Sequence, residues 1–287
     1  MARFFICVLG VVVLASAVWL VSAKRGHTQS PAEDHAKLEL VSEQNALGSG
    51  QDLLVGVRFI LEDGWHTYWI NPGDSGEAPR IKWQLPVGFQ AGSIQWPYPA
   101  RLTTPPFTDY GYEHEVLLMV PIRLPEKLKE GETEKIAAQV HFLICRDVCI
   151  PGQKQLELSL PVKNRAVASP GRELFAAARA RIPSPTPPNW KISLASIGDE
   201  FVLNLRIGEP AKVLQFFPLD PEQIQNCASQ DVTVFPGGVR LHLKKSNHLL
   251  EPIARLRGLV VVDSERAYSV DVPVSRFIKN APAQIAD

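Results

Sequence analysis

The chain has 287 residues, and its 30 Lys and Arg residues balance its 30 Asp and Glu residues, so its formal net charge at pH 7 is zero. Such a chain lacks the excess positive charge that attracts nucleic acid or anionic lipid, which argues against both classes of partner. Hydrophobic residues make up 45% and charged residues 21%, which excludes a disordered chain and a polytopic membrane protein. The length indicates about two domains, and the 24 Pro and 19 Gly residues favour strands and turns over helical bundles.

Residues 1–23 have the pattern of an export signal. Arg3 precedes an uncharged apolar run at residues 4–23 that ends in small residues. We expect cleavage after Ala23, and the alternative is an uncleaved anchor, because about 20 apolar residues also suffice to span a bilayer. Both alternatives place the rest of the chain outside the cytoplasm, beginning with a flexible stretch at residues 24–37.

Residues 38–165 contain short alternating apolar runs separated by turns. Between Leu53 and Leu61 apolar side chains recur at every second position, and Arg58 faces the other way. Further strands are expected at residues 116–124, 136–144 and 155–160. Short strands between turns favour an antiparallel β-sandwich over alternating strands and helices.

Residues 166–189 are expected to separate two domains. Ser169 and Pro170 predict the N-cap and first position of a helix that continues through residues 173–181. The proline-rich stretch 182–188 cannot continue this helix and predicts a stiff spacer.

Alternation resumes in residues 190–280, which we expect to form a smaller β-sandwich without a catalytic cluster. Its strands are expected at residues 201–207, 239–243 and 268–274, and a tail follows at residues 281–287. The predicted fold is therefore all-β: an antiparallel β-sandwich, one helix with a proline-rich linker, and a second, smaller β-sandwich.

Three cysteines remain once the export signal, with its own cysteine, is removed: Cys145, Cys149 and Cys227. Four residues of extended strand span about 13 Å, whereas a disulfide needs Cα atoms about 4.4 to 6.8 Å apart. Cys145 and Cys149 can therefore pair only if the chain turns at residues 146–148. The strands expected on either side of this segment make such a turn plausible.

The chemistry of this pair stays open between two interpretations. A disulfide that closes a small loop adds little stability, which favours an exchange-active bond. A structural disulfide is an equally good interpretation, because such bonds are common in oxidising compartments. A third alternative is a copper(I) or zinc site that adds His141, although the spacing is not a standard ligand pattern. Cys227 is expected to be a free, partly buried thiol or to pair between chains.

Other motifs narrow the function further. The sequence contains neither a Gly-x-Ser-x-Gly nor a His-Glu-x-x-His motif, so a hydrolase lacks support. Aromatic residues gather at residues 64–74 and 107–112. We expect Trp65 and Trp69 to fill the core, and the loop at 107–112 to shield a reactive disulfide.

Four segments of the N-terminal half form an ordered set of motifs: Asp63–Trp69, Ile94–Pro97, Tyr110–Tyr112 and Cys145–Pro151. Together they resemble the periplasmic N-terminal domain of the DsbD-type thiol:disulfide interchange family. The copper-tolerance-associated branch of that family, often called ScsB-like, is the most similar. The resemblance covers residues 38–162, and the β-domain that follows is also similar to that branch.

The resemblance implies an immunoglobulin-like sandwich in the periplasm whose catalytic pair is Cys145 and Cys149. This pair would take electrons from a membrane-embedded thiol reductase and pass them to periplasmic thioredoxin-fold proteins, without a cofactor or a metal. His66 and Tyr68 would lie near the pair, where the family tends to have tyrosines. The family usually continues into membrane and thioredoxin-like domains, whereas this sequence ends at Asp287. If the pair works as a relay, we therefore expect its electron donor to be a separate protein.

The chain departs from the family pattern in its cap loop and in its cysteine spacing. Asp109 stands where the family has a capping aromatic residue, so Phe107 or Tyr110 would have to shield the pair. The spacing between the cysteines is shorter than in better-known members. The alternative hypothesis is a non-catalytic periplasmic module that binds a protein or copper(I) and has a structural disulfide, so the sequence leaves open whether the protein is an enzyme.

Overall fold

The computed structural model describes residues 31–165, 167–208 and 214–276, so the predicted export signal and the C-terminal tail lie outside the described residues. Within these residues, no helix has the length and apolar character needed to cross a membrane. A single turn of 3-10 helix, Pro31–Asp34, precedes the first strand. The strands of the N-terminal half are β1 (Ala36–Ser42), β2 (Gln44–Ala46), β3 (Leu53–Leu61), β4 (His66–Gly73), β5 (Arg80–Gln84), β6 (Gln90–Ala91), β7 (Ala100–Thr104), β8 (Phe107–Glu113), β9 (Glu115–Arg123), β10 (Thr133–Cys145), β11 (Cys149–Pro161) and β12 (Val167–Ala168).

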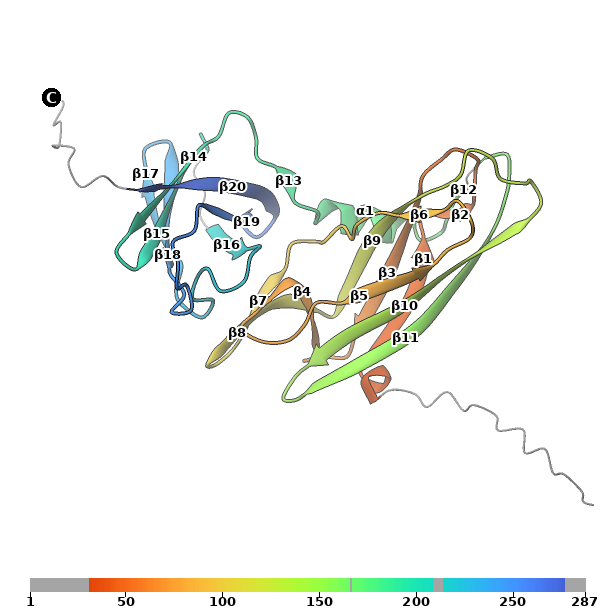
Figure 1. The fold of residues 1–287 in the computed structure, drawn as a ribbon, viewed down its shortest axis with the longest axis horizontal. Helices are drawn as coiled ribbons and strands as arrows, with labels where there is room; N and C mark the ends of the chain where they lie inside the picture. Colours follow the sequence, from red (N-terminus) through yellow and green to blue (C-terminus); the bar gives the residue numbers. More distant parts are fainter. Residues whose placement is uncertain (1–30, 166, 209–213, 277–287) are drawn as a thin grey trace, which may run out of the picture.

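These strands form the two layers of an immunoglobulin-like β-sandwich (Figure 1). One sheet has the order β1-β3-β9-β6, and the other has the order β11-β10-β4-β8-β7, with β5 also paired to β10. β12 pairs with β2 at the margin of the domain. Every neighbouring pair in the two large sheets is antiparallel, as the alternating pattern predicts.

β9 is buried on both faces, which explains its nearly continuous run of apolar residues. Its alternate residues Val116 to Ile122 enter the core between the two sheets. Leu117 and Met119 point the other way and pack with Phe175 of the only α-helix in the described residues, α1 (Arg172–Ala180). The helix therefore closes the outer face of this sheet.

The helix begins later than the sequence predicts. Gly171 is its N-cap, so the expected N-cap at Ser169 and first helical position at Pro170 are wrong. The Ser169 hydroxyl donates to the carbonyl oxygen of Ser42 at 2.7 Å and accepts the Gly171 N–H at 3.1 Å. This serine therefore ties the turn before the helix to the end of β1, which is a tertiary role that the local pattern does not show.

The C-terminal half is a second sandwich-like unit with its own core. Its strands follow the order β16-β19-β20-β14-β15-β18-β17, and β13 also pairs with β20. β20 pairs with β19 along most of its length and with β14 near its end, so it joins the two layers. The strands are β13 (Ser184–Pro185), β14 (Lys191–Ile197), β15 (Glu200–Arg206), β16 (Leu214–Pro218), β17 (Asp231–Phe235), β18 (Gly238–Lys244), β19 (Arg255–Val262) and β20 (Arg266–Arg276).

The two halves pack against each other. Among the described residues, every strand pairing lies within one half, yet four residues of the C-terminal half join the core of the N-terminal half. They are Phe217, Leu259, Val261 and Ala267. Part of the proline-rich stretch is itself strand β13, paired with β20, so it is held against the C-terminal sheet instead of acting only as a spacer.

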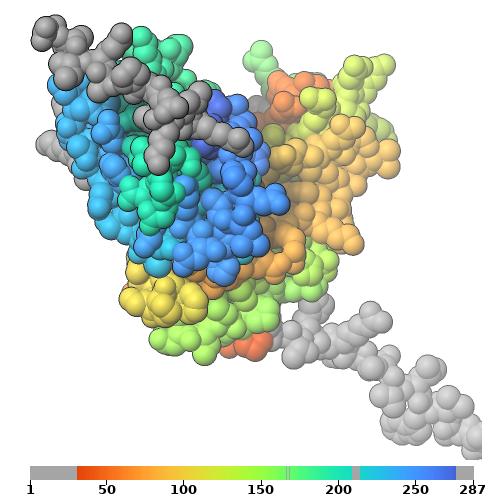
Figure 2. Space-filling view, turned by 60° about the vertical axis from the view of Figure 1, so that its left-hand side comes forward, coloured from red at the N-terminus to blue at the C-terminus, as the bar shows by residue number. Residues whose placement is uncertain are grey.

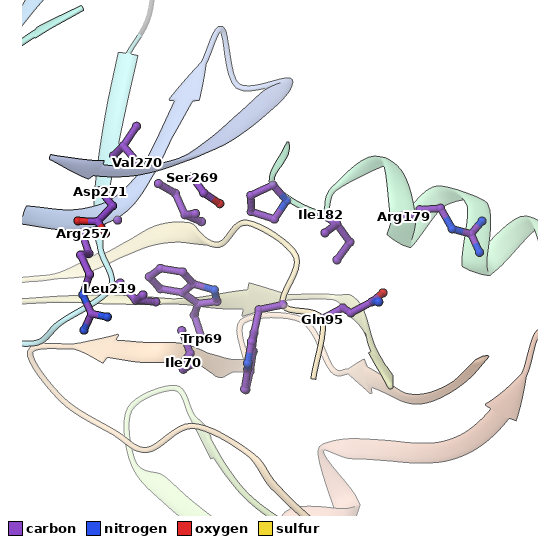
Figure 3. A pocket seen from close by; sticks show the side chains of 14 residues that line it. Trp69, Ile70, Gln95, Arg179, Ile182, Leu219, Arg257, Ser269, Val270 and Asp271 are labelled. Atoms are coloured by element: carbon purple, nitrogen blue, oxygen red, sulfur yellow. The ribbon is translucent and has the colours of Figure 1, made fainter. Parts of the chain in front are cut away.

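A groove of about 730 Å³ also lies between the halves (Figure 3). Trp69 and Trp96 line it from the N-terminal half, and Leu219 and Leu259 line it from the C-terminal half. No cysteine is among its lining residues.

Candidate active site

The two cysteines close the end of the β10–β11 hairpin. The strands pair in register from Thr133 and Pro161 to Cys145 and Cys149, which are direct partners with Cα atoms 4.1 Å apart and are joined by a disulfide. Residues 146–148 make the turn that the spacing requires, so the predicted pairing is confirmed. The hairpin register alone brings the two cysteines together.

The two sulfur-bearing residues differ in exposure. Cys145 is only 3% exposed, whereas Cys149 and the turn residue before it, Val148, are exposed. A thiolate must approach a disulfide sulfur directly to attack it. The geometry therefore favours attack at Cys149 and makes Cys145 the sulfur that leaves into the protein interior.

Tyr68 of β4 supplies a hydrogen-bond donor at the buried sulfur. β4 lies beside β10, with His66 opposite Cys145, and this register places the Tyr68 hydroxyl where it donates to Cys145 Sγ at 2.7 Å. The same hydroxyl is 3.7 Å from Cys149 Sγ. Tyr68 is fully buried, and burial raises its pKa to about 12, so the phenol keeps its proton at neutral pH. A hydrogen-bond donor that keeps its proton at neutral pH therefore faces Cys145 Sγ.

The turn Asp74–Gly76, here called the shielding turn, covers the ring of Tyr68. A Cβ atom added at Gly76 would lie 2.1 Å from Tyr68 Cζ, so the backbone itself packs on the phenol. Asp109 of β8 holds this turn, because its carboxylate accepts the Ser75 N–H and the Ser75 hydroxyl, each at 2.9 Å. Asp109, which stands where we expected a capping residue, is thus 8% exposed and anchors a different loop.

His66 lies next to this arrangement with its ring largely buried. Its Nε2 atom is 3.9 Å from Asp109 Oδ2 and has no hydrogen-bond partner within the described part of the chain. The ring meets the edge of Tyr68 with centroids 5.2 Å apart. Burial lowers the pKa of His66, and the carboxylates of Asp109 and Glu113 oppose this effect. The ring is therefore held neutral beside the disulfide.

The expected cap loop is divided between two places. Phe107 is 52% exposed at the tip of the β7–β8 hairpin, which points to the same end of the domain as the β10–β11 turn (Figures 1 and 2). Tyr110 is fully buried and packs on Phe217 of the C-terminal half, with ring centroids 5.3 Å apart. The structure thus places Tyr68 against the pair and His66 beside Tyr68, whereas Asp109 holds the shielding turn and Tyr110 lies in the contact between the halves.

Sequence reasoning missed the shielding turn. The turn lies near Tyr68 because β4 pairs irregularly with β8, and no local sequence pattern predicts this irregularity. The expected packing role of Trp65 and Trp69 is confirmed, because they are 2% and 1% exposed.

The structure also bears on the metal alternative and on the third cysteine. Within the described ranges, no three His, Cys, Asp or Glu side chains gather as metal ligands. His141 is exposed on β10, and both neighbouring cysteines are consumed by the disulfide. Cys227, between β16 and β17, is a free thiol as expected, but it is exposed, so the expected partial burial is wrong.

The comparisons with known proteins give a family match for the N-terminal half and a fold match for most of the chain. Residues 37–161 match the family model of the thiol:disulfide interchange protein DsbD, N-terminal. The N-terminal periplasmic domain of ScsB from Proteus mirabilis superposes with a TM-score of 0.64 at 19% identity, over 85% of this chain and 95% of that chain, and so shares its fold.

Two further solved structures are much less similar. The Escherichia coli chaperone DraB matches with a TM-score of 0.21 at 11% identity, over 83% of this chain and 97% of that chain. The human desmocollin-1 ectodomain has a TM-score of 0.21 at 13% identity, over 84% of this chain and 36% of that chain. Neither score indicates a common fold. No curated protein matches the chain in sequence.

Proposed function

Residues 37–161 belong to the family of DsbD N-terminal domains, and on this premise we propose that the Cys145–Cys149 pair relays electrons in thiol–disulfide exchange. The donor would be a membrane-embedded thiol reductase, and the acceptors would be thioredoxin-fold proteins of the periplasm. The family and the disulfide together support a thiol–disulfide interchange module. The observation that carries the relay is the asymmetry of the bond, with one exposed sulfur and one buried sulfur that faces a protonated phenol.

Reduction of the pair follows from this asymmetry. A donor thiolate attacks Cys149 Sγ, the sulfur–sulfur bond breaks, and its electron pair leaves on Cys145, where the Tyr68 hydroxyl donates to the new thiolate. A second donor thiol then attacks its neighbour in the mixed disulfide and releases Cys149. The donor leaves as a disulfide, and the module holds two thiols.

Oxidation runs through the same atoms. The Cys149 thiolate attacks an acceptor disulfide and forms a mixed disulfide, and one acceptor sulfur leaves as a thiolate. Cys145 then attacks Cys149 Sγ and restores the bond, and the second acceptor sulfur is released. Two electrons pass to the acceptor, and no cofactor takes part in these steps.

As a purely structural crosslink, this disulfide would add little stability to the β10–β11 hairpin. β10 and β11 are paired residue by residue along their whole length, so hydrogen bonds already close the hairpin. The bond joins residues only four apart, where a crosslink restricts the unfolded chain least.

The relay is tested in a C227S background, which removes the exposed third thiol. Oxidised protein is mixed with an excess of a reduced thioredoxin-fold protein, which drives the reversible exchange in the direction opposite to the proposed relay, and alkylation of both cysteines is followed by mass. We expect both thiols to appear as the partner is oxidised. A disulfide that remains oxidised at a redox potential of about −300 mV, in the range of structural disulfides, would refute the relay.

The order of attack needs a second measurement in the same background. The reduced C145S variant, which keeps Cys149, should form a stable mixed disulfide with an oxidised thioredoxin-fold protein. The C149S variant, which keeps only the buried cysteine, should form very little. Equal trapping by both variants would contradict the assignment of Cys149 as the attacking residue.

A further inference from the structure

A polar side chain of the C-terminal half reaches the redox site of the N-terminal half. Asn226 lies between β16 and β17, is 6% exposed, and uses both ends of its amide across the contact. Its Nδ2 donates to Asp74 Oδ1 at 2.9 Å, and its Oδ1 accepts the Tyr110 hydroxyl at 2.8 Å. Buried amides that satisfy two partners at once fix the relative position of both.

The backbone around Asn226 is held as well. Arg101 of β7 donates to the carbonyl oxygens of Asn226 and Ala228, the second at 3.0 Å. The position of the amide is therefore set by β7 and β8 together and does not depend on one contact. The Asn226 side chain is therefore fixed in position where it donates to Asp74.

Asp74 begins the shielding turn and is bound on both carboxylate oxygens. While Oδ1 accepts from Asn226, Oδ2 accepts the Thr108 N–H at 2.7 Å, and the Asp74 N–H donates to the Thr108 carbonyl oxygen at 3.1 Å. Gly76 at the other end of the turn packs on the Tyr68 ring. A continuous series of contacts thus runs from Asn226 through the shielding turn to the Tyr68 hydroxyl and Cys145.

We propose that Asn226 is a positioning residue of the redox site, through which the C-terminal half holds the shielding turn over Tyr68 and keeps Cys145 from solvent. The proposal rests on the proposed function for its biological meaning, since shielding matters for a cysteine that exchanges. It assigns the C-terminal half a role in the reactivity of a disulfide that lies entirely in the N-terminal half. Cys149, which is already exposed, lies outside this control.

The test compares alkylation rates in the reduced full chain. Wild type and N226A are reduced with dithiothreitol, treated with limiting iodoacetamide, and mapped by mass at each cysteine. Loss of a hydrogen bond to a carboxylate should open the shielding turn about tenfold more often. We therefore expect Cys145 to react about tenfold faster in N226A, while Cys149 reacts at the wild-type rate and serves as an internal control.

Two further variants make the result specific. D74N keeps an oxygen for the Thr108 N–H but turns an amide donor toward Asn226, so it should reproduce the N226A result even if N226A folds poorly. Y98F removes a different hydrogen bond between the halves, from Tyr98 to the Ser264 carbonyl oxygen at 3.2 Å, and should leave Cys145 unchanged.

Three outcomes would overturn the proposal: unchanged Cys145 alkylation in both N226A and D74N, equal acceleration at both cysteines, or the same acceleration in Y98F. Failure of the proposed function is recognised separately. In that case wild-type protein does not exchange with a thioredoxin-fold protein, whatever the alkylation rates are.

Discussion

Replacement of Tyr68 by Phe removes one hydroxyl from the site and keeps the ring on which the shielding turn packs. In the oxidised protein this hydroxyl donates to a disulfide sulfur, which is a weak acceptor. In the reduced protein the acceptor is the Cys145 thiolate, and a hydrogen bond to a charged group contributes about 1.5–3 kcal/mol. Tyr68 is fully buried, so solvent does not screen this difference. The substitution therefore destabilises the reduced state more than the oxidised state.

The size of the effect follows from the two-electron couple. A free-energy difference of about 1.4 kcal/mol corresponds to about 30 mV, so Y68F should make the reduction potential more negative by roughly 30 to 65 mV at a pH where Cys145 is a thiolate. The midpoint of the pH profile of Cys145 alkylation should rise by about one to two pH units. The first quantity is measured by equilibration with dithiothreitol, and the second by mass mapping.

Y112F is the matched control for Y68F. Tyr112 belongs to the same sheet, is 2% exposed, and donates its hydroxyl to the Pro97 carbonyl oxygen at 2.7 Å, away from the cysteines. This variant should lose about 1 kcal/mol of stability with the potential unchanged. A Y68F potential equal to that of wild type, or an equal shift in both variants, would refute the assignment of Tyr68 as the donor that stabilises the Cys145 thiolate.

Two further substitutions test the surroundings of the pair. Burial lowers the pKa of His66 in the folded protein, so the unfolded chain binds the proton first as the pH falls. The contribution of the neutral ring to the free energy of unfolding is therefore fully present above about pH 6.5. Below that pH this contribution is lost, by at most about 1.4 kcal/mol per pH unit. Urea unfolding at pH 7.5 and 5.5 should show a smaller loss in H66Q, and equal losses in both proteins would contradict the buried neutral ring. In G76A, the added methyl group would lie 2.1 Å from Tyr68 Cζ, so we expect faster Cys145 alkylation and a larger loss of stability than in the control G131A, where nothing lies within 4 Å. Both residues have a positive φ, +82° and +84°, so the backbone strain of about 1–2 kcal/mol is common to both variants. Equal stability losses with unchanged alkylation would contradict the packing of Gly76 on Tyr68.

Much of the fold follows from local pattern. The expected strands at residues 53–61 and 136–144 are confirmed, because period-two burial is a property of the strand itself. The disulfide follows as well, since a turn of three residues between paired strands leaves Cys145 and Cys149 opposite each other. Ser169 misled the prediction of the helix start because its hydroxyl has a tertiary partner in Ser42, and a local rule contains no such partner.

The environment of the pair does not follow from local pattern, because it is built from contacts between distant segments. Tyr68 and Cys145 are 77 residues apart, and Asn226 and Asp74 are 152 residues apart. Tyr110 shows the difficulty most clearly. An aromatic residue beside glycine suits a shielding loop and a buried contact equally well, and only the position of the C-terminal half decides between them.

An irregularity in β4 connects the surroundings of the cysteine pair with the contact between the halves. Tyr68 pairs with Gly111 and Gly73 with Asp109, so five residue steps along β4 match only two along β8. The extra residues bulge from the sheet, where Trp69 meets Phe217 and the Asn71 side chain donates to the Pro218 carbonyl oxygen at 2.8 Å. Bulges re-aim side chains and are common next to active sites. Because the same short stretch places Tyr68 against the disulfide on one side and Trp69 against Phe217 of the C-terminal half on the other, we expect a change in domain packing to alter the surroundings of the cysteine pair.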